Sequence, residues 1–132
     1  MANKSVEAFR KLTEQLKQDV ITNAIAELNT QANQLKEDIA SVAPRERGEL
    51  AHSVRVVQSQ KPTVVRIVAG GKLTVRPAIS ATPYDYARAD EFGTVKMQAR
   101  PFFFPTYRLR KKKIIAAMKR RIVANIKKYS AA

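Results

Sequence analysis

The sequence has no cysteine, no tryptophan and a single histidine, His52. Without cysteine the chain has no disulfide framework and no thiolate chemistry, and one histidine is too few for a histidine-based metal site. Apolar stretches are only a few residues long, far below the ~20 residues that a bilayer-spanning helix requires. The first residues also lack the apolar run of a secretory signal. We therefore expect a protein made in the cytoplasm, with no membrane span, cofactor or metal ion.

Positive charge is what the sequence has in excess. The 132 residues carry 25 Lys and Arg against 11 Asp and Glu, which gives a net charge of +14. The net charge is 0 over residues 1–48, +4 over 49–100 and +10 over 101–132, where no acidic residue occurs. Such an imbalance favours a polyanion, an acidic partner or a lattice of neighbours. A hydrophobic content of 45% can supply one core, so we expect a single domain over residues 1–132.

Residues 1–43 are expected to form one long helix. They contain neither glycine nor proline, and apolar residues recur every three or four positions from Phe9 to Val42. At ~1.5 Å per residue the helix approaches ~55 Å, more than one small core can cover. Part of it should therefore pack on another subunit. Weak helix formers at Asn23 and 29–31 mark a place where the helix could bend, and Pro44 should end it.

Residues 50–79 are expected to form antiparallel strands. The β-branched runs 52–57, 63–68 and 73–76 have the composition and approximate alternation of strands. Lys61 and Pro62 mark the first turn. Gly70 and Gly71 predict a two-residue hairpin between the second and third runs, because glycine readily adopts the positive φ of hairpin turns.

The last third predicts two helices joined by a loop. Pro83 should open a short helix over 83–93, followed by a loop over 94–101 and a helix over 102–130. The final helix has an apolar side with Ile115, Met118, Ile122 and Ile126. The expected fold class is α+β: a long N-terminal helix, a small antiparallel sheet with a Gly-Gly hairpin, a short helix, and a basic amphipathic C-terminal helix packed on the sheet.

Residue patterns for catalysis are weak. His52 lies next to Ser53, but neighbours on a strand point to opposite faces, so His52 is badly placed to activate the hydroxyl. Gly70, Gly71 and Lys72 lack the spacing of a phosphate-binding loop and precede a strand. We therefore expect no enzyme.

The basic C-terminal segment is the main candidate site. Two interpretations are equally open at this point: a solvated helix face, or a contact surface for nucleic acid or an acidic protein. The sequence shows no zinc ligands or helix-turn-helix spacing, so a DNA contact should be to the backbone and sensitive to salt. The candidate residues are Arg108, Arg110, Lys111, Lys112, Lys113, Arg120, Arg121, Lys127 and Lys128.

Between these regions lies a motif that resembles a known family. Residues 86–94 read YARADEFGT, and 97–102 read MQARPF. This order resembles the signature of head-tail joining or tail-completion proteins of long-tailed bacteriophages and gene-transfer particles, in which a basic helix follows. The family's upstream segment is similar to Ala43-Pro44, Gly48-Glu49-Leu50 and Ser53-Val54, whereas Arg45-Glu46-Arg47 departs from its usual turn. The matching residues are Tyr86, Ala87, Glu91, Phe92, Gly93, Thr94, Ala99, Arg100, Pro101 and Phe102.

The resemblance implies a structural virion protein at the junction of tail and neck, with no catalysis. Members of the family are similar to tail terminators, which form a ring, usually of six subunits, that caps the tail tube and meets the neck or stopper protein. DNA passes through the lumen of such a ring, where non-specific contact with packaged DNA is expected. The competing hypothesis is a free-standing basic protein that binds the DNA phosphate backbone.

Physical roles can be assigned within the motif. Gly93 should adopt a backbone conformation closed to other residues, and Glu91 should pair with Arg100 or with an arginine of a neighbour. Phe92 and Phe102 should anchor the loop to the core. One or two of the rings of residues 102–104 should lie in the core, and at least one is expected to reach a neighbour.

Overall fold

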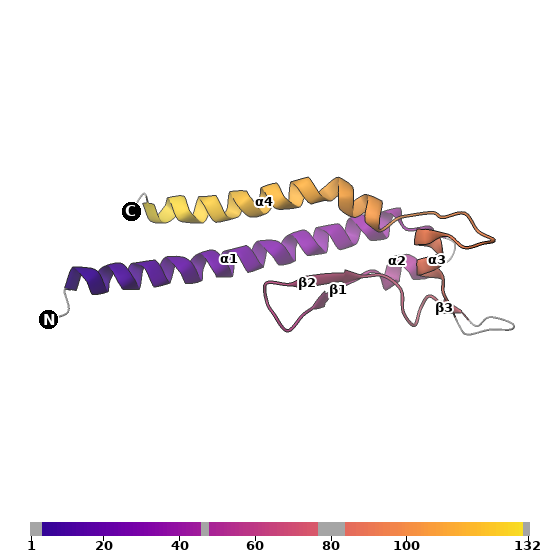
Figure 1. Cartoon of the computed structure of the whole chain (residues 1–132), viewed down its shortest axis with the longest axis horizontal. Helices are drawn as coiled ribbons and strands as arrows, with labels where there is room; N and C mark the ends of the chain where they lie inside the picture. The colour runs from indigo at the N-terminus through magenta and orange to yellow at the C-terminus, as the bar shows by residue number, and fades with distance from the viewer. Residues whose placement is uncertain (1–3, 46–47, 77–83, 131–132) are drawn as a thin grey trace.

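The α+β class is confirmed by the computed structural model, which describes residues 4–45, 48–76 and 84–130 (Figure 1). A long helix comes first, followed by a short helix, four short strands, a second short helix and a long C-terminal helix. In chain order the elements are α1 (Lys4–Val42), α2 (Glu49–Ser53), β1 (Arg55–Gln58), β2 (Val65–Val68), β3 (Val75–Arg76), β4 (Tyr84–Asp85), α3 (Tyr86–Phe92) and α4 (Phe104–Ser130).

Helix α1 runs without a break over 39 residues. At the positions where a bend was predicted, side chains donate hydrogen bonds to the backbone carbonyl four residues earlier in the same helix. Asn23 donates to Asp19 O at 2.9 Å, and Asn29 donates to Ile25 O at 3.0 Å. These bonds satisfy the polar side chains inside the helix, so they do not interrupt it. The helix ends before Pro44, as predicted.

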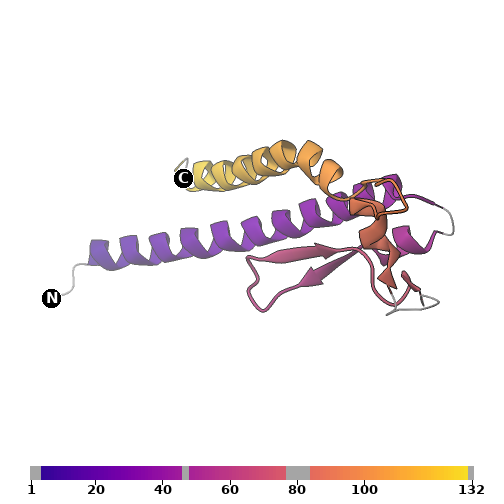
Figure 2. The ribbon, with the colours of Figure 1, turned by 45° about the vertical axis from the view of Figure 1, so that its right-hand side comes forward.

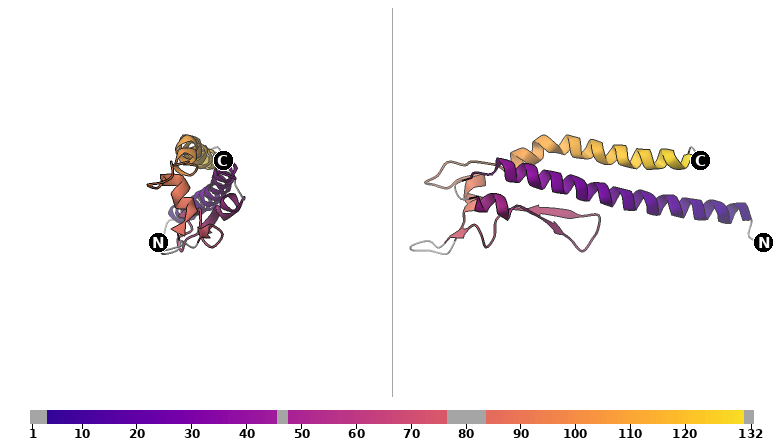
Figure 3. Two further views of the ribbon diagram at one scale, coloured as in Figure 1. Left: turned by 90° about the vertical axis from the view of Figure 1, so that its right-hand side faces the viewer. Right: turned by 180° about the vertical axis from the view of Figure 1, so that it is seen from behind.

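Helix α4 lies antiparallel to α1, and the two form a rod (Figures 1 and 2). At one end, Tyr129 and Asn125 of α4 reach Asp19 of α1, and at the other Arg110 reaches Asp38. The N-terminal end of α1 projects beyond the C-terminal end of α4 (Figures 1 and 3). The β1–β2 hairpin packs along another side of α1 and covers part of its length, so α1 lies between the hairpin and α4.

The β1–β2 hairpin confirms the predicted turn at Lys61 and Pro62. The strands pair antiparallel, with Arg55 opposite Val68 and Gln58 opposite Val65. The Val64 N–H donates to Lys61 O at 3.1 Å and closes the turn. The side-chain amide of Gln58 donates to Asn29 Oδ1 at 2.8 Å, which ties the hairpin to α1.

Two details of the predicted strand region are wrong. Residues 49–53 form α2 rather than the start of a strand, because Gly48 stands at its N-terminus with a φ of 77° and Glu49-Leu50-Ala51 are good helix formers. The Gly70-Gly71 hairpin is also absent among the described strands, since β2 pairs with β1 and β3 pairs with β4. Gly70 and Gly71 do have positive φ, at 97° and 126°, but they turn the chain toward Asp85. Residues 77–79 and Pro83 lie outside the described residues.

The core is small and lies at one end of the rod. It joins the end of α1, α2, α3 and the start of α4, and its fully buried side chains include Ile39, Leu50 and Phe102. Along α4 the predicted apolar side is only partly covered, because Met118 and Ile122 are half-buried while Ile115 and Ile126 are 44% and 47% exposed. The buried cluster consists of Leu35, Ile39, Ala43, Leu50, Val54, Ala87 and Phe102.

Candidate functional site

Glu91 joins the end of α3 to the start of α4. Its carboxylate is buried and accepts three backbone N–H groups, from Phe102 at 2.8 Å, Phe103 at 2.9 Å and Phe104 at 3.0 Å. The first N–H groups of a helix have no partner inside the helix, and a carboxylate there satisfies them and the helix dipole. The predicted pairing of Glu91 with Arg100 is therefore wrong: the glutamate serves the helix terminus instead.

Arg100 pairs with Asp90, which is not among the motif residues predicted from the sequence. Its Nε and Nη2 donate to Asp90 Oδ1 at 3.2 and 2.8 Å, and its backbone N–H donates to Asp90 O at 2.6 Å. The Asp90 side chain is only 5% exposed. The adjacent acids of the motif therefore have different partners: Asp90 binds Arg100, and Glu91 binds the backbone of residues 102–104. No local sequence signal marks these partners, because Asp90 and Glu91 lie at the end of α3, well before α4 begins at Phe104.

Gly93 has the conformation that the sequence predicts. Its φ of 77° and ψ of 172° lie in a region that is essentially open to glycine alone. A Cβ here would meet Ala99 N at 2.9 Å and Met97 O at 3.1 Å, both of them backbone atoms. Thr94 and Met97 exchange backbone hydrogen bonds of 2.9 and 3.3 Å across the same loop. Loop 94–101 therefore folds back closely against Gly93.

The aromatic residues of the motif separate into buried and exposed rings. Phe102 is 1% exposed and belongs to the core, as predicted, and Phe103 packs beside it. Phe92 is 65% exposed, so its predicted role as a core anchor is wrong. It lies five residues after buried Ala87, about 140° further around the helix, and so faces outward. Its ring packs on half-exposed Phe104, with centroids 6.0 Å apart. Val95, in loop 94–101, is fully exposed.

The remaining motif residues take structural or surface positions. Ala87 is buried, Ala99 is half-buried, and Thr94 and Pro101 are exposed. Tyr86 is half-buried and donates its hydroxyl to Glu49 Oε2 at 3.3 Å. Burial, together with the nearby Glu49 carboxylate, raises the pKa of Tyr86 above 10.0. The Arg76 guanidinium lies 5.1 Å from the centre of the Tyr86 ring and pairs with Glu49.

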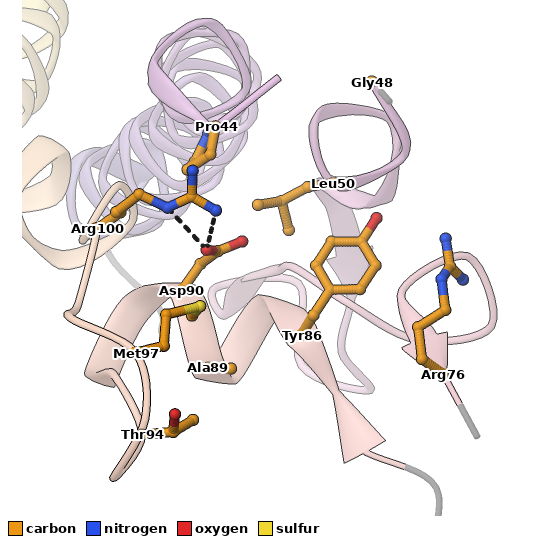
Figure 4. A pocket seen from close by; sticks show the side chains of 10 residues that line it. All are labelled: Pro44, Gly48, Leu50, Arg76, Tyr86, Ala89, Asp90, Thr94, Met97 and Arg100. Carbon is orange, nitrogen blue, oxygen red and sulfur yellow. Dashed lines mark hydrogen bonds and ion pairs between the residues drawn. The ribbon is translucent and has the colours of Figure 1, made fainter. Parts of the chain in front are cut away.

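A cavity of about 740 Å³ opens between α2, α3 and loop 94–101 (Figure 4). Leu50, Tyr86 and Met97 give it apolar walls, and Asp90 and Arg100 face each other beside them. Its charged groups are satisfied within the protein, because Arg100 pairs with Asp90 and Arg76 pairs with Glu49. We therefore interpret the cavity as a junction where α2, α3 and loop 94–101 meet.

His52 and Ser53 are not arranged for catalysis. Ser53 is buried on α2, where its hydroxyl donates to Leu50 O at 2.6 Å and accepts from Gly70 N–H at 2.9 Å. His52 is exposed, and its side chain lies on a different side of this helix. The hydroxyl is committed to holding the Gly70 turn against α2, which explains why a serine is buried here.

The predicted basic face of α4 is exposed except at one residue. Arg110 is half-buried, and its Nη2 lies 2.6 Å from Asp38 Oδ2 of α1. It therefore belongs to the helix pair, which corrects its assignment to the outer face. The exposed candidates are Arg108, Lys111, Lys112, Lys113, Arg120, Arg121, Lys127 and Lys128, and Lys119 of the same basic run is exposed as well.

Large apolar side chains are also exposed away from the motif. On the projecting end of α1, Phe9 and Leu12 are 69% and 51% exposed, and Leu109 of α4 is 80% exposed. The total accessible surface is 10112 Å². A compact monomer of 14.8 kDa has about 7,000 Å². The chain thus exposes about 3,000 Å² more than a compact fold of its mass.

Comparisons add no assignment to this geometry. Within residues 4–45, 48–76 and 84–130, no helix is long and apolar enough to cross a membrane, and no group of three or more metal-binding side chains comes together. Comparison of the chain with protein-family models, curated proteins and solved structures finds no significant match.

Proposed function

We propose that the chain is a structural virion protein, a tail terminator or head-tail joining component. In this proposal several copies, six in the usual arrangement, form a ring that caps the phage tail tube and connects it to the neck protein. DNA passes through the lumen. The protein is made in the host cytoplasm and ends at the tail-neck junction of the particle. Its role requires no catalysis and no cofactor.

The observation that carries the proposal is the excess surface. A 10112 Å² surface with exposed Phe9, Phe92 and Leu109 is costly for a solitary chain. A ring gives each subunit two neighbours, and a standard interface buries about 800 Å² on each partner. Two such contacts and one with the tube would cover most of the excess. Closed cyclic symmetry also covers these surfaces without unlimited growth.

The motif loop supports the same function. Glu91, Asp90 and Gly93 fix loop 94–101 from inside, while Phe92, Val95 and Phe104 face outward. A loop that is hydrogen-bonded near both ends and displays apolar side chains suits a contact between subunits, because less conformational entropy is lost on binding than with an unattached loop. In this proposal, the residues that resemble the tail-completion signature hold the exposed apolar side chains in place for assembly.

Electron microscopy of purified tail tubes mixed with the protein tests the proposal. We expect one ring at a tube end with the wild-type chain, and none with the variant F92S/V95S. Both side chains are exposed, so the variant should remain folded. Its control is V57S/V64S, which removes two exposed valines from the β1–β2 hairpin. Bare tube ends with folded wild-type protein would contradict the proposal, as would normal capping by F92S/V95S.

The alternative is a free-standing basic DNA-binding protein. The exposed cations of α4 favour it, and it needs neither rings nor tubes. Binding to tube ends, compared with binding to duplex DNA, distinguishes the two functions. A connector binds tube ends whether or not DNA is present, whereas a free-standing protein binds duplex DNA and ignores the tubes.

A further inference from the structure

A row of cations lies on the side of α4 that faces away from α1. Residues Arg110, Ala117, Met118 and Asn125 are half-buried, and Arg110 and Asn125 contact α1 directly. A residue two positions further along a helix lies about 200° around the helix axis, and therefore on the opposite side. The residues at those positions, here called the outer row, are all basic and exposed: Lys112, Lys119, Arg120 and Lys127.

Helix α4 itself contributes no negative side chain beside the outer row. Helix α4 has no acidic residue over its 27 positions. Among the described residues, Asp19 and Asp38 of α1 contact α4 from the other side, and Glu91 contacts only its first residue, Phe104. Arg108, Lys111 and Lys113 add further positive charge on the flanks. Such a surface attracts an anion that can extend along the helix.

The side chains between the cations favour a phosphate backbone over an acidic protein. Ala116 and Val123, neither of which is aromatic, occupy the outer side between Lys112 and Lys127. Protein interfaces are anchored by large aromatic side chains. The aromatic residues of α4 are Phe104, Tyr107 and Tyr129, near its two ends. Their absence between the cations also disfavours single strands, which bind by stacking bases on aromatic rings.

We propose that the outer row of α4 binds the phosphate backbone of duplex DNA without reading its base sequence. From Lys112 to Lys127 the row extends about 23 Å, and a duplex presents about 13 phosphate charges over that length. The cations, rather than the phosphates, therefore limit the number of contacts. Because the row is a property of α4 alone, the inference does not depend on ring formation or on the tail tube.

The test measures fluorescence anisotropy of a labelled 30-bp duplex over a series of salt concentrations. The variant K112Q/K119Q/R120Q removes three outer-row charges and keeps residues that favour a helix. The control K11Q/K61Q/R66Q removes three exposed charges from α1 and the hairpin region, so both proteins have the same net charge. Circular dichroism confirms that both are folded, and K112Q alone provides a milder second variant.

We expect the outer-row variant to lose affinity by at least about tenfold at 0.1 M salt. Its log-log salt slope should become shallower by about 2.7, since each phosphate contact contributes about 0.9. K112Q should show about a third of that change in slope. The control should change the slope by less than about 1, and duplexes of scrambled sequence should bind equally well.

Four results would overturn the inference. The first is a wild-type chain that leaves the duplex free at 0.05 M salt, and the second is an outer-row variant that binds like the wild type. Equal losses in the variant and the control would show that only net charge matters. Binding of poly-glutamate as tight as that of the duplex would assign the row to an acidic protein surface. Normal capping of tube ends by the outer-row variant would leave the connector proposal intact in each case.

Discussion

At the scale of single residues, the motif acts through backbone contacts. Glu91 accepts hydrogen bonds from the N–H groups at the start of α4, which have no partner inside the helix. Asp90, the neighbouring residue, binds the Arg100 side chain. Gly93 allows loop 94–101 to return within contact distance of α3. These three positions set the direction in which Phe92 and Val95 are displayed.

Replacing Glu91 tests its role at the start of α4. Glu91→Gln removes the negative charge and one of the two acceptor oxygens, which leaves buried N–H groups poorly satisfied. We expect the free energy of unfolding to fall by about 1–3 kcal/mol in urea denaturation. The control Glu37→Gln alters an exposed residue of α1 and should stay within about 0.5 kcal/mol. Equal stability of the two variants would contradict the capping role.

Gly93 can be compared with a second glycine of the same φ. Gly48 and Gly93 both have φ of 77°, but a Cβ at Gly48 meets only a His52 side-chain atom at 4.0 Å. Gly48→Ala should therefore cost about 1 kcal/mol, from backbone strain alone. Gly93→Ala adds the strain of a ψ of 172°, compared with −10° at Gly48, and a clash with the Ala99 backbone, so it should cost about 2–4 kcal/mol. Equal losses in thermal or urea unfolding would show that neither the ψ nor the close approach at Gly93 matters for stability.

At the scale of elements, the two long helices have 39 and 27 residues, yet α1 contributes only Leu35 and Ile39 to the buried cluster and α4 contributes none. The sequence predicts them well because their periodicity is unbroken and Pro44 bounds the first. Helix α2 was missed because its five residues are too few to show periodicity beside a β-branched run. The pairing of β3 with β4 was missed because Tyr84-Asp85 has no strand pattern.

The candidate site was predicted in part. Gly93 and Phe102 have the expected roles, since a glycine at a helix end and an apolar residue in a motif have few alternatives. The partners of Glu91 and Asp90 depend on how α3 and α4 approach each other, which local sequence does not specify. Phe92 was assigned to the core from hydrophobicity, whereas its side of α3 is set by packing.

The projecting end of α1 should matter for assembly and not for folding. Phe9 and Leu12 are exposed, so F9S/L12S should change the free energy of unfolding by less than about 1 kcal/mol. Association of the chain with itself or with tail tubes should weaken, because those side chains lose apolar area. Sedimentation equilibrium and urea denaturation measure the two effects, with A8S/T13S as control. A large loss of stability with unchanged association would reverse this assignment.

At the scale of the whole molecule, excess charge and excess surface have the same consequence. A net charge of +14 opposes folding through self-repulsion, and α4 concentrates much of it. Neutral salt screens this repulsion. We expect the midpoint of thermal unfolding to rise by about 3–5 °C between 0.02 and 0.5 M NaCl, measured by circular dichroism. A midpoint that falls over this range would show that attractive ion pairs dominate instead.

The central claim is that the chain is a building block whose exposed surfaces are covered by other subunits at the end of a tail tube. Quantitative sedimentation of the protein with purified tubes of known length tests it most directly. The account predicts saturation at a fixed number of copies per tube, about six at each capped end and independent of tube length. Copies that increase with tube length, or a chain that stays monomeric beside tubes at every concentration, would contradict it.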